Sequence, residues 1–476
     1  MGETARDFHR LTNHDPAWRR PRDPRLVHGF RPMRPDRQPP QFKTFPGCGA
    51  TPLPRDLRLG ATPDVGMVGS LLFLSAGVTR VKETLGGLVS FRAAASAGNL
   101  APVELYLVTG DIDGLDPGIY HYQPREHGLV RLTRAPSDAP TALVLTGVPW
   151  RTAWKYRERG LRHCYWDAGT MLANTLTASE AAGCDARVEL AFADAELAAV
   201  VGADGTHEFP LALLRLGAAT TPLPEPADAP FGQLAEDSPE FPLITETQQA
   251  GDLHEADVAA WARSSAELPT APAPAAGEWT PHGPIPELIR RRGATRRFDP
   301  ALLAPLGLLT DALGWAARPV PADFLPAGGT LLEHNIAIHA VDGIAPGLYR
   351  WGTDGLNAIR EGDVRDLARA LCLAQDLGGD SSYTAFHCAD ADRITAALGS
   401  RGYRAAQLEA GIVAGRLQLA AFDHRFGATG LTFFDDEVRR AFKTEAWPML
   451  VTAVGAAAYR SKPGGLPGQP ARLSPT

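Results

Sequence analysis

Residues 91–108 hold the local pattern that decides the fold, Phe91-Arg-Ala-Ala-Ala-Ser-Ala-Gly-Asn-Leu-Ala-Pro-Val-Glu-Leu-Tyr-Leu-Val108. Four small residues in the middle of this stretch would let backbone amides approach a flat or anionic ligand closely. They are Ser96, Ala97, Gly98 and Asn99. Pro102 then stiffens the chain, and residues 103–108 predict a buried strand. The stretch therefore predicts a ligand-binding loop that leads into a core strand, and a plain loop of small residues is the alternative.

The same landmarks return about 230 residues later, in the same order. The small-residue loop returns as Pro326-Ala-Gly-Gly329, and the turn Gly114-Leu-Asp-Pro-Gly118 returns as Gly343-Ile-Ala-Pro-Gly347. Arg159-Gly-Leu-Arg162 has its counterpart in Arg401-Gly-Tyr-Arg404. Matching landmarks at nearly one spacing are typical of a tandem repeat. The chain is therefore predicted to contain two copies of one domain that pack on each other.

This repeat and the local composition divide the chain into five segments. We predict an Arg/Pro-rich arm at residues 1–50, a first domain at 51–217, a Pro-rich linker at 218–284, a second domain at 285–460 and a disordered tail at 461–476. Most of the arm is expected to be solvated or to lie over the surface, and one helix is expected in the linker near residues 255–266.

Each copy is expected to mix helices with strands. The first copy has helical patterns near residues 65–78 and 164–183, with strands between 129 and 148. The second copy has helical patterns near 302–317 and 404–426.

The composition is that of a globular protein with no nucleic-acid partner. Of the 476 residues 44% are hydrophobic and 21% are charged, and the net charge of −7 gives no basic surface for nucleic acid. No apolar run approaches the roughly 20 residues that span a membrane, and the first residues have no secretory pattern. The five cysteines have no CxxC spacing, so we expect reduced thiols, no structural zinc and a cytoplasmic location.

Several common catalytic motifs are missing from the sequence. No GxGxxG opens a helix, and there is no GxxxxGK[ST], HExxH or GxSxG pattern. A Rossmann dinucleotide domain, a phosphate-loop nucleotidase, a zincin and a typical hydrolase are therefore disfavoured.

Two segments of the second copy could bind an anion. Arg292 and Arg296 flank the small step Gly293-Ala294-Thr295 and could converge on a phosphate, with the small residues leaving amides free to help. Further on, Gly427-Ala-Thr-Gly430 would permit a close backbone approach, and Thr429 could add a hydroxyl. A solvated arginine face and a glycine helix cap leading into an edge strand are the alternatives.

Lys155 and Tyr156 are candidates for proton transfer. The chain has only five lysines among its 47 basic residues, so arginine carries nearly all of the positive charge. A lysine can lose its proton when it is desolvated, whereas an arginine cannot, and a neighbouring tyrosine could relay that proton. A coincidental pairing is the alternative.

At these residues the sequence resembles the nitroreductase superfamily, and within it the SagB-type dehydrogenases, which include the FMN-dependent azoline dehydrogenases of thiazole/oxazole peptide biosynthesis. The matching pieces in the first half are Phe8-His-Arg-Leu-Thr-Asn-His14, residues 96–106, residues 114–122, Lys155-Tyr156 and Asp167-Ala-Gly169. Those in the second half are Arg292-Gly-Ala-Thr-Arg-Arg-Phe298, Gln375-Asp376, Thr429-Gly430 and Phe434-Asp-Asp436.

The resemblance implies an α+β fold of two nitroreductase-like domains, packed as an intramolecular pseudo-dimer that binds FMN where the copies meet. It places Arg292, Ala294, Arg296, Thr429 and Gly430 of one copy, and Ser96, Ala97, Gly98 and Asn99 of the other, at the cofactor. Only copy two has the arginine segment and only copy one has the full small-residue loop, so one FMN per chain is expected. Ala294 stands where the family usually has serine, which removes one hydroxyl donor to the phosphate.

The resemblance also implies hydride transfer between flavin N5 and a small heterocyclic or peptide substrate, with Lys155 and Tyr156 removing a proton from the substrate. Azoline-to-azole dehydrogenation with reoxidation by oxygen is the first interpretation. An NAD(P)H-dependent reductase of nitroaromatics or quinones is the second, and a non-catalytic flavin-binding or scaffold protein is the third. Further oligomerisation of the fused chain is compatible with all three.

Overall fold

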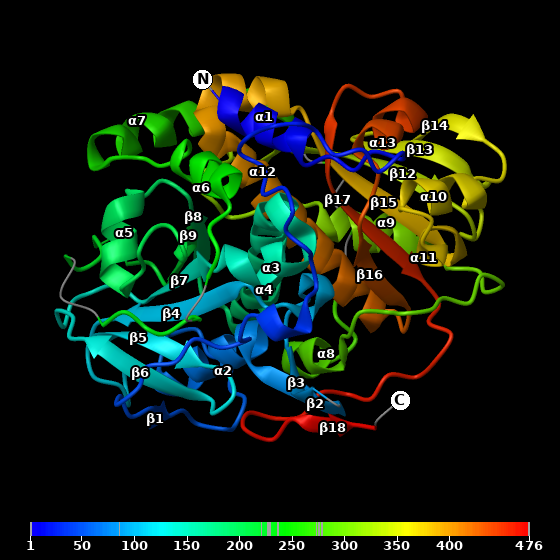
Figure 1. Ribbon diagram of the computed structural model, residues 1–476. Coiled ribbons are helices and arrows are strands. Elements are labelled where there is room, and N and C mark those ends of the chain that lie inside the picture. The colour runs from blue at the N-terminus through cyan, green and yellow to red at the C-terminus, as the bar shows by residue number, and fades with distance from the viewer. Residues whose placement is uncertain are drawn as a thin grey trace. The chain divides into compact units, whose positions relative to one another are not determined.

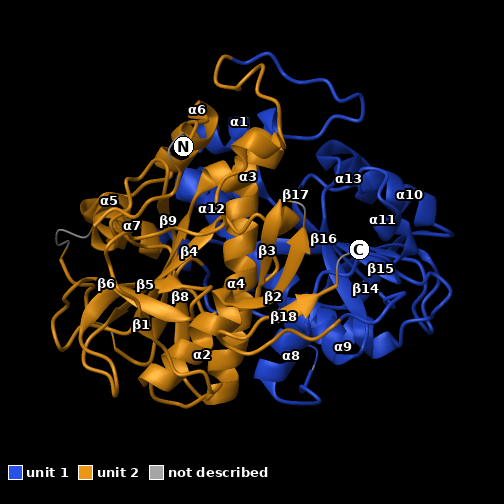
Figure 2. Cartoon of the chain, turned by 60° about the horizontal axis from the view of Figure 1, so that its bottom comes forward, with its two compact units in different colours: residues 1–23, 264–320, 325–461 blue, residues 24–263, 321–324, 462–476 orange. Residues whose placement is uncertain are grey.

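The computed structural model describes residues 2–84, 86–219, 221–225, 230–235, 238–272, 274, 277 and 279–474. The chain divides into two compact units (Figure 2). Unit 1 comprises residues 1–23, 264–320 and 325–461, and unit 2 comprises residues 24–263, 321–324 and 462–476. Each unit combines an antiparallel sheet with a long buried helix, so the α+β class predicted from the sequence is confirmed.

The main sheet of unit 2 has seven strands in the order β1-β6-β5-β4-β7-β9-β8 (Figure 1). Its central strands β4 and β7 are buried at every residue, and both are mostly apolar, although β4 also buries Glu104. The strands are β1 (Thr51–Pro52), β4 (Val103–Thr109), β5 (Gly118–Gln123), β6 (Gly128–Thr133), β7 (Ala142–Gly147), β8 (Ala186–Glu189) and β9 (Phe209–Leu216).

The helices of unit 2 centre on α4 (Gly160–Ala182), whose small residues allow close packing. Helix α2 (Val65–Ala76) packs on it, and the Ser75 and Thr175 hydroxyls share a hydrogen bond there. The remaining helices are α3 (Pro149–Tyr156), α5 (Asp194–Val201) and α6 (Pro242–Gln249), and α7 (Glu255–Ala266) crosses the boundary between the units. A second sheet contains β2 (Val78–Thr84), β3 (Gly87–Arg92) and β18 (Ala471–Leu473).

Unit 1 has a six-stranded sheet in the order β14-β13-β12-β15-β17-β16. Its strands are β12 (Leu332–Ile338), β13 (Gly347–Gly352), β14 (Gly355–Glu361), β15 (Tyr383–Ala389), β16 (Gly427–Leu431) and β17 (Trp447–Gly455), and a two-stranded ladder joins β10 (Ala271–Pro272) to β11 (Gly329–Thr330). Its helices are α1 (Glu3–Leu11), α8 (Ile285–Arg291), α9 (Leu306–Ala316), α10 (Arg365–Leu371), α11 (Asp376–Asp380), α12 (Ala391–Asp423) and α13 (Asp435–Phe442). Helix α12 is kinked at Gly399, whose φ of 64° favours glycine.

The two main sheets have the same strand order. The series β6-β5-β4-β7-β9-β8 of unit 2 corresponds, strand for strand in chain order, to β14-β13-β12-β15-β17-β16 of unit 1. In the chain, the long helix α4 lies between β7 and β8 of unit 2, and the long helix α12 lies between the corresponding strands β15 and β16 of unit 1. This agreement of topology supports the repeat that the spaced sequence landmarks predict.

The ends of the chain and the linker are more ordered than the sequence predicted. The disordered tail predicted at residues 461–476 is corrected, because β18 pairs in parallel with β2. Within the predicted arm, residues 3–11 form α1, which buries Ala5 and Phe8 in unit 1. The linker contains α6 in addition to the predicted helix at residues 255–266. The tail strand and α1 are stabilised by partners far away in the sequence, so local composition could not reveal them.

Lys43 anchors the second part of the predicted arm to unit 2. Its ammonium lies 2.6 Å from Glu208 Oε2 and donates to the Tyr106 hydroxyl at 2.8 Å, and the Lys43 and Glu208 side chains are 1% and 2% exposed. Glu208 also accepts from the Tyr106 hydroxyl and from Thr146 Oγ1. The expectation of a solvated arm therefore fails here, because the one lysine of the arm neutralises a buried carboxylate.

Replacing Lys43 with methionine should leave Glu208 as an unpaired buried carboxylate. We expect the free energy of unfolding to fall by about 3–5 kcal/mol, as measured by urea denaturation. The double variant Lys43→Met/Glu208→Gln should recover most of that loss, because the buried charge is then gone. Equal losses in the single and double variants would show that the ion pair is not what holds the arm.

Candidate functional site

The loop before β4 has a left-handed backbone at three positions. We call residues 96–101 the amide loop. Gly98, Asn99 and Ala101 have φ values of 63°, 58° and 49°. A positive φ is costly for a non-glycine residue, and more so before a proline such as Pro102. Such strain persists only where surrounding contacts fix it, and it concentrates at functional sites.

Hydrogen bonds from helix α4, and one within the loop itself, hold this conformation. The Asp167 carboxylate on α4 accepts the Ala97 N–H, with its two oxygens at 3.0 and 3.2 Å from the nitrogen. One turn later on the same helix, the Thr170 hydroxyl donates to the Ala95 carbonyl at 2.7 Å. Ser96 Oγ accepts the Ala101 N–H at 2.8 Å and so closes the loop on itself.

Two further side chains hold the far end of the amide loop. Arg151 on α3 donates to the Ala101 carbonyl at 2.9 Å. Gln41 donates to the Asn99 carbonyl at 2.9 Å, and its side-chain oxygen lies 3.3 Å from the Ser90 nitrogen on β3. The loop is therefore fixed by side chains of α4 and α3 and by Gln41 of the predicted arm.

Some backbone N–H groups of the loop have an acceptor in the described part of the protein, and others do not. The N–H groups of Ala97 and Asn99 bond to Asp167 and to the Ser96 carbonyl. Among the residues that the structure describes, no acceptor faces the N–H of Ser96 or of Gly98, and Gly98 is exposed. Two donors at the tip are thus available for a ligand, as the small-residue pattern predicted.

Lys155 and Tyr156 lie at the same loop. A Cβ atom added to Gly98 would sit 3.1 Å from the Tyr156 hydroxyl and 3.3 Å from the Lys155 ammonium. Both residues belong to the last turn of α3, which ends there because Arg157 has a φ of 53°. The Tyr156 ring also stacks on His163, with ring centroids 3.9 Å apart. The structure therefore brings the predicted proton-transfer pair and the predicted ligand loop together in unit 2.

Buried charges surround the base of this cluster. Burial lowers the pKa of Arg92 to about 10, although Glu104 opposes the shift. Burial alone would raise the pKa of Glu104, but Arg151, His121 and Arg92 together hold it below its usual range. Arg151 Nη1 lies 2.5 Å from Glu104 Oε1. Burial raises the pKa of Asp167 to about 7, against the hydrogen bonds from Ser96 and Ala97. Perturbed carboxyls of this kind are enriched at functional sites.

In unit 1 the structure brings together the other two predicted segments. Thr295 donates its N–H to the Ala428 carbonyl at 3.0 Å, and Ala294 and Ala428 form a parallel bridge. Gly427 has to be glycine, because an added Cβ would lie 2.1 Å from Thr295 Oγ1. The Arg292 guanidinium is buried beside α12, where it donates to Gln418 Oε1 at 3.2 Å.

Two details of this second cluster bear on the sequence prediction. Residues 427–431 form the edge strand β16, which matches the alternative of a chain leading into an edge strand. Helix α8 ends at Arg291, so Arg292 and Arg296 lie beyond its end, and Arg296 is exposed. Thr429 is buried and Gly430 is exposed. The nine predicted cofactor residues thus form two clusters, one within each unit.

The loop of copy two that corresponds to the amide loop is built differently. Residues 329–330 pair with β10 from the predicted linker. Glu409 on α12 accepts from the Thr330 hydroxyl at 2.6 Å and from the Leu331 N–H at 2.9 Å. A Cβ on Gly329 would lie 2.2 Å from Thr270 Oγ1. The second part of this loop, Gly329 and Thr330, is therefore buried, whereas Ala327 and Gly328 are exposed as Gly98 is.

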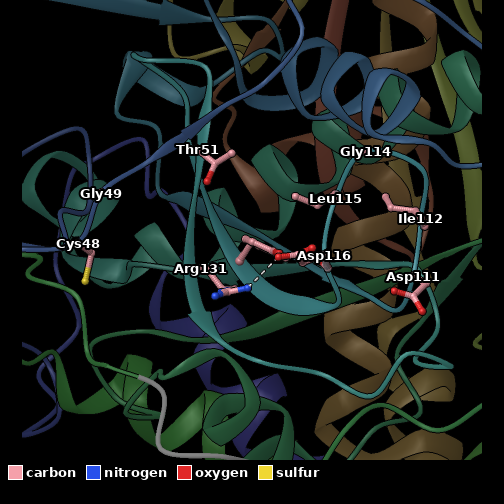
Figure 3. A pocket seen from close by; sticks show the side chains of 10 residues that line it. Cys48, Gly49, Thr51, Asp111, Ile112, Gly114, Leu115, Asp116 and Arg131 are labelled. Carbon is pink, nitrogen blue, oxygen red and sulfur yellow. Dashed lines mark hydrogen bonds and ion pairs between the residues drawn. The ribbon is translucent and has the colours of Figure 1, made fainter.

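A cavity of about 760 Å³ in unit 2 lies away from the candidate residues (Figure 3). The side chain of Arg131 points toward Asp116, with 3.4 Å between nitrogen and oxygen, and both are exposed. The lining also includes Asp111, so the single cation is neutralised. An open, mixed-charge cavity of this kind gives no reason to relocate the candidate site.

The described residues contain neither a metal-ligand group nor a membrane-spanning helix. Across the described part of the chain, no group of three or more His, Cys, Asp or Glu side chains is placed to hold a metal ion. Among the described helices, none is long and apolar enough to cross a bilayer.

The whole chain is similar in fold to a candidate nitroreductase of Anabaena variabilis ATCC 29413. The alignment covers 96% of this chain and 100% of that one, with a TM-score of 0.75 and 24% identity. This chain has the nitroreductase fold. Because the alignment spans the full length of both proteins, the likeness includes both copies. In sequence, the chain is 26% identical over 162 residues to the candidate nitroreductase MJ1384 of Methanocaldococcus jannaschii, covering 31% of this chain and 77% of that protein. No family model matches the chain.

Three residues of the cluster had no role in the sequence prediction. Asp167 was quoted only within the piece Asp167-Ala-Gly169 that resembles the family, and Gln41 and Arg151 were not singled out. The repeat held a usable signal for Asp167, because Asp167 and Glu409 are acidic residues at matching positions 242 apart on the two long helices. Nothing local marks Gln41, whose contacts with Ser90 and Asn99 span 49 and 58 residues.

The raised pKa of Asp167 predicts a pH-dependent stability. Because its folded-state pKa of about 7 exceeds the ordinary 3.8, protonation stabilises the fold, and this contribution is lost as the pH rises from 3.8 to 7. Between about pH 4 and pH 8, the free energy of unfolding of the native protein should fall by on the order of 2–4 kcal/mol relative to Asp167→Asn. Urea denaturation across this range measures the difference. A difference that does not change with pH would contradict the assignment.

Proposed function

We propose that this protein is an FMN-dependent oxidoreductase of the nitroreductase type, and that both clusters serve one bound FMN. The observation that carries the proposal is that each copy contains one of the two clusters and lacks the other. Copy two has the arginine segment beside β16, and copy one has an amide loop with open donors beside Lys155 and Tyr156. Neither copy has both.

The residues present fit the chemical needs of FMN. Its phosphate requires cations and hydrogen-bond donors, which Arg292, Arg296 and the backbone near Thr429 and Gly430 would provide. Its ring system requires a flat approach and donors to its oxygen and nitrogen atoms, which the open N–H groups of Ser96 and Gly98 would provide. When bound, FMN supplies two-electron chemistry by accepting or giving a hydride at its ring.

Lys155 and Tyr156 would handle the proton that accompanies the hydride. Both polar tips lie within contact distance of a Cβ position at Gly98, the exposed tip of the amide loop. A lysine amine or a tyrosine hydroxyl placed this way can take a proton from a substrate carbon as its hydride leaves. The pair matches the Lys-Tyr pair in the azoline dehydrogenases that the sequence resembles, so a peptide-borne azoline is the substrate we propose.

The arginine segment supports a single FMN per chain. Copy one has no arginine pair near its start like that of Arg292 and Arg296. In unit 1, β10 pairs with β11 and Glu409 binds Thr330 and Leu331, although Ala327 and Gly328 are exposed. A reciprocal site would therefore lack the arginines for the phosphate.

The purified protein should bind one FMN per chain, measured by absorbance titration of the FMN-free protein. Arg292→Ala should weaken binding about 10-fold or more, because a charge-assisted contact to the phosphate is lost. Arg360→Ala, on β14 of the same unit, is the matched control and should bind FMN normally. A ratio of two, or unchanged binding by Arg292→Ala, would refute this arrangement.

Lys155→Ala and Tyr156→Phe should retain FMN and lose turnover of an azoline peptide by about 100-fold or more, as expected when a general base is removed. Stopped-flow reduction of the bound flavin by the peptide is the measurement. Fast reduction by NADPH without any peptide would favour the nitroaromatic or quinone reductase instead. A protein that remains colourless after reconstitution with FMN would favour the non-catalytic scaffold.

A further inference from the structure

Asp167 is the only carboxylate among the described residues that hydrogen-bonds the amide loop, and the proposed chemistry does not use it. It is 3% exposed and lies in the middle of α4. Both of its oxygens are within 3.2 Å of the Ala97 nitrogen. A buried acceptor of this kind is costly unless its hydrogen bonds are made.

The bond from Ala97 to Asp167 determines which way the loop presents its amides. With the Ala97 N–H directed to α4, the two neighbouring N–H groups, those of Ser96 and Gly98, are left without a protein acceptor in the described structure. Ser96 Oγ accepts the Ala101 N–H, so the turn is closed on itself while Asp167 holds it at Ala97.

In copy two, Glu409 can be compared with Asp167. Glu409 occupies the matching place on α12, is also buried, and also binds the loop before the corresponding strand. Its bonds go to Thr330 and Leu331, at the start of β12, and the backbone before them pairs with β10. The two acidic residues thus bind their loops at different atoms, Asp167 at Ala97 and Glu409 at Thr330 and Leu331.

We propose that Asp167 is a positioning residue that sets the amide loop in the conformation that receives the flavin ring. The inference rests on the proposed function for the identity of the ligand. The conformation of the loop is inferred from the hydrogen bonds of Asp167 alone. Asp167 does not touch the reacting atoms and acts through Ala97.

Hydrogen–deuterium exchange of the FMN-free protein tests the positioning role without any activity. Asp167→Ala removes both acceptors, so amide exchange at the bonded positions Ala97, Asn99 and Leu100 should accelerate about 10-fold or more. Asp167→Asn retains one acceptor oxygen and should give a smaller acceleration. Glu409→Ala is the matched control, and it should speed exchange at Leu331 and leave residues 96–100 as they are.

FMN titration of the same variants supplies the second readout. Asp167→Ala should raise the Kd for FMN about 10-fold, Asp167→Asn should raise it less, and Glu409→Ala should leave it unchanged. Native exchange rates and a native Kd in Asp167→Ala would overturn the proposal, as would equal loop exchange in Asp167→Ala and Glu409→Ala. If the native protein binds no FMN, the proposed function fails, and the exchange rates still decide the role of Asp167 in the loop.

Discussion

The left-handed backbone of the amide loop is the constraint on which the candidate site depends. A positive φ at Ala101, directly before Pro102, is unfavourable in isolation. It is held by bonds from three separate elements, through Asp167, Arg151 and Gln41. Two of these side chains are charged and almost fully buried, so their hydrogen bonds to the loop offset a desolvation cost as well as the backbone strain. The result is a rigid turn with free amides at its tip.

The two copies keep one scaffold and differ in what surrounds the same loop. Six strands of each main sheet have the same order, and each long helix carries an acidic residue that binds the loop before the third strand of the series. In copy one the loop lies beside Lys155 and Tyr156, whereas in copy two a linker strand pairs with Gly329 and Thr330. Copy two instead retains the arginine segment along β16. On our proposal, this division of ligand sets leaves one complete flavin site in a chain with two related halves.

The sequence predicted the parts of the fold that follow from local pattern. The strand expected at residues 103–108 is β4, the helix expected at 255–266 is α7, and the α+β class is confirmed. Helix α1 and strand β18 required contacts with distant segments, which periodicity does not encode. The roles of Asp167 and Gln41 were also missed, because each depends on which backbone amide or carbonyl the fold places opposite the side chain. The roles assigned to Arg292, Lys155 and their partners stay predictions.

A crystal structure of the protein with FMN tests the central claim most directly. The account predicts one FMN per chain, with its phosphate within hydrogen-bond distance of Arg292 and its ring against the N–H of Gly98, while Asp167 still accepts from Ala97. An FMN that contacts only one of the two clusters, or a second FMN at residues 326–331, would contradict it.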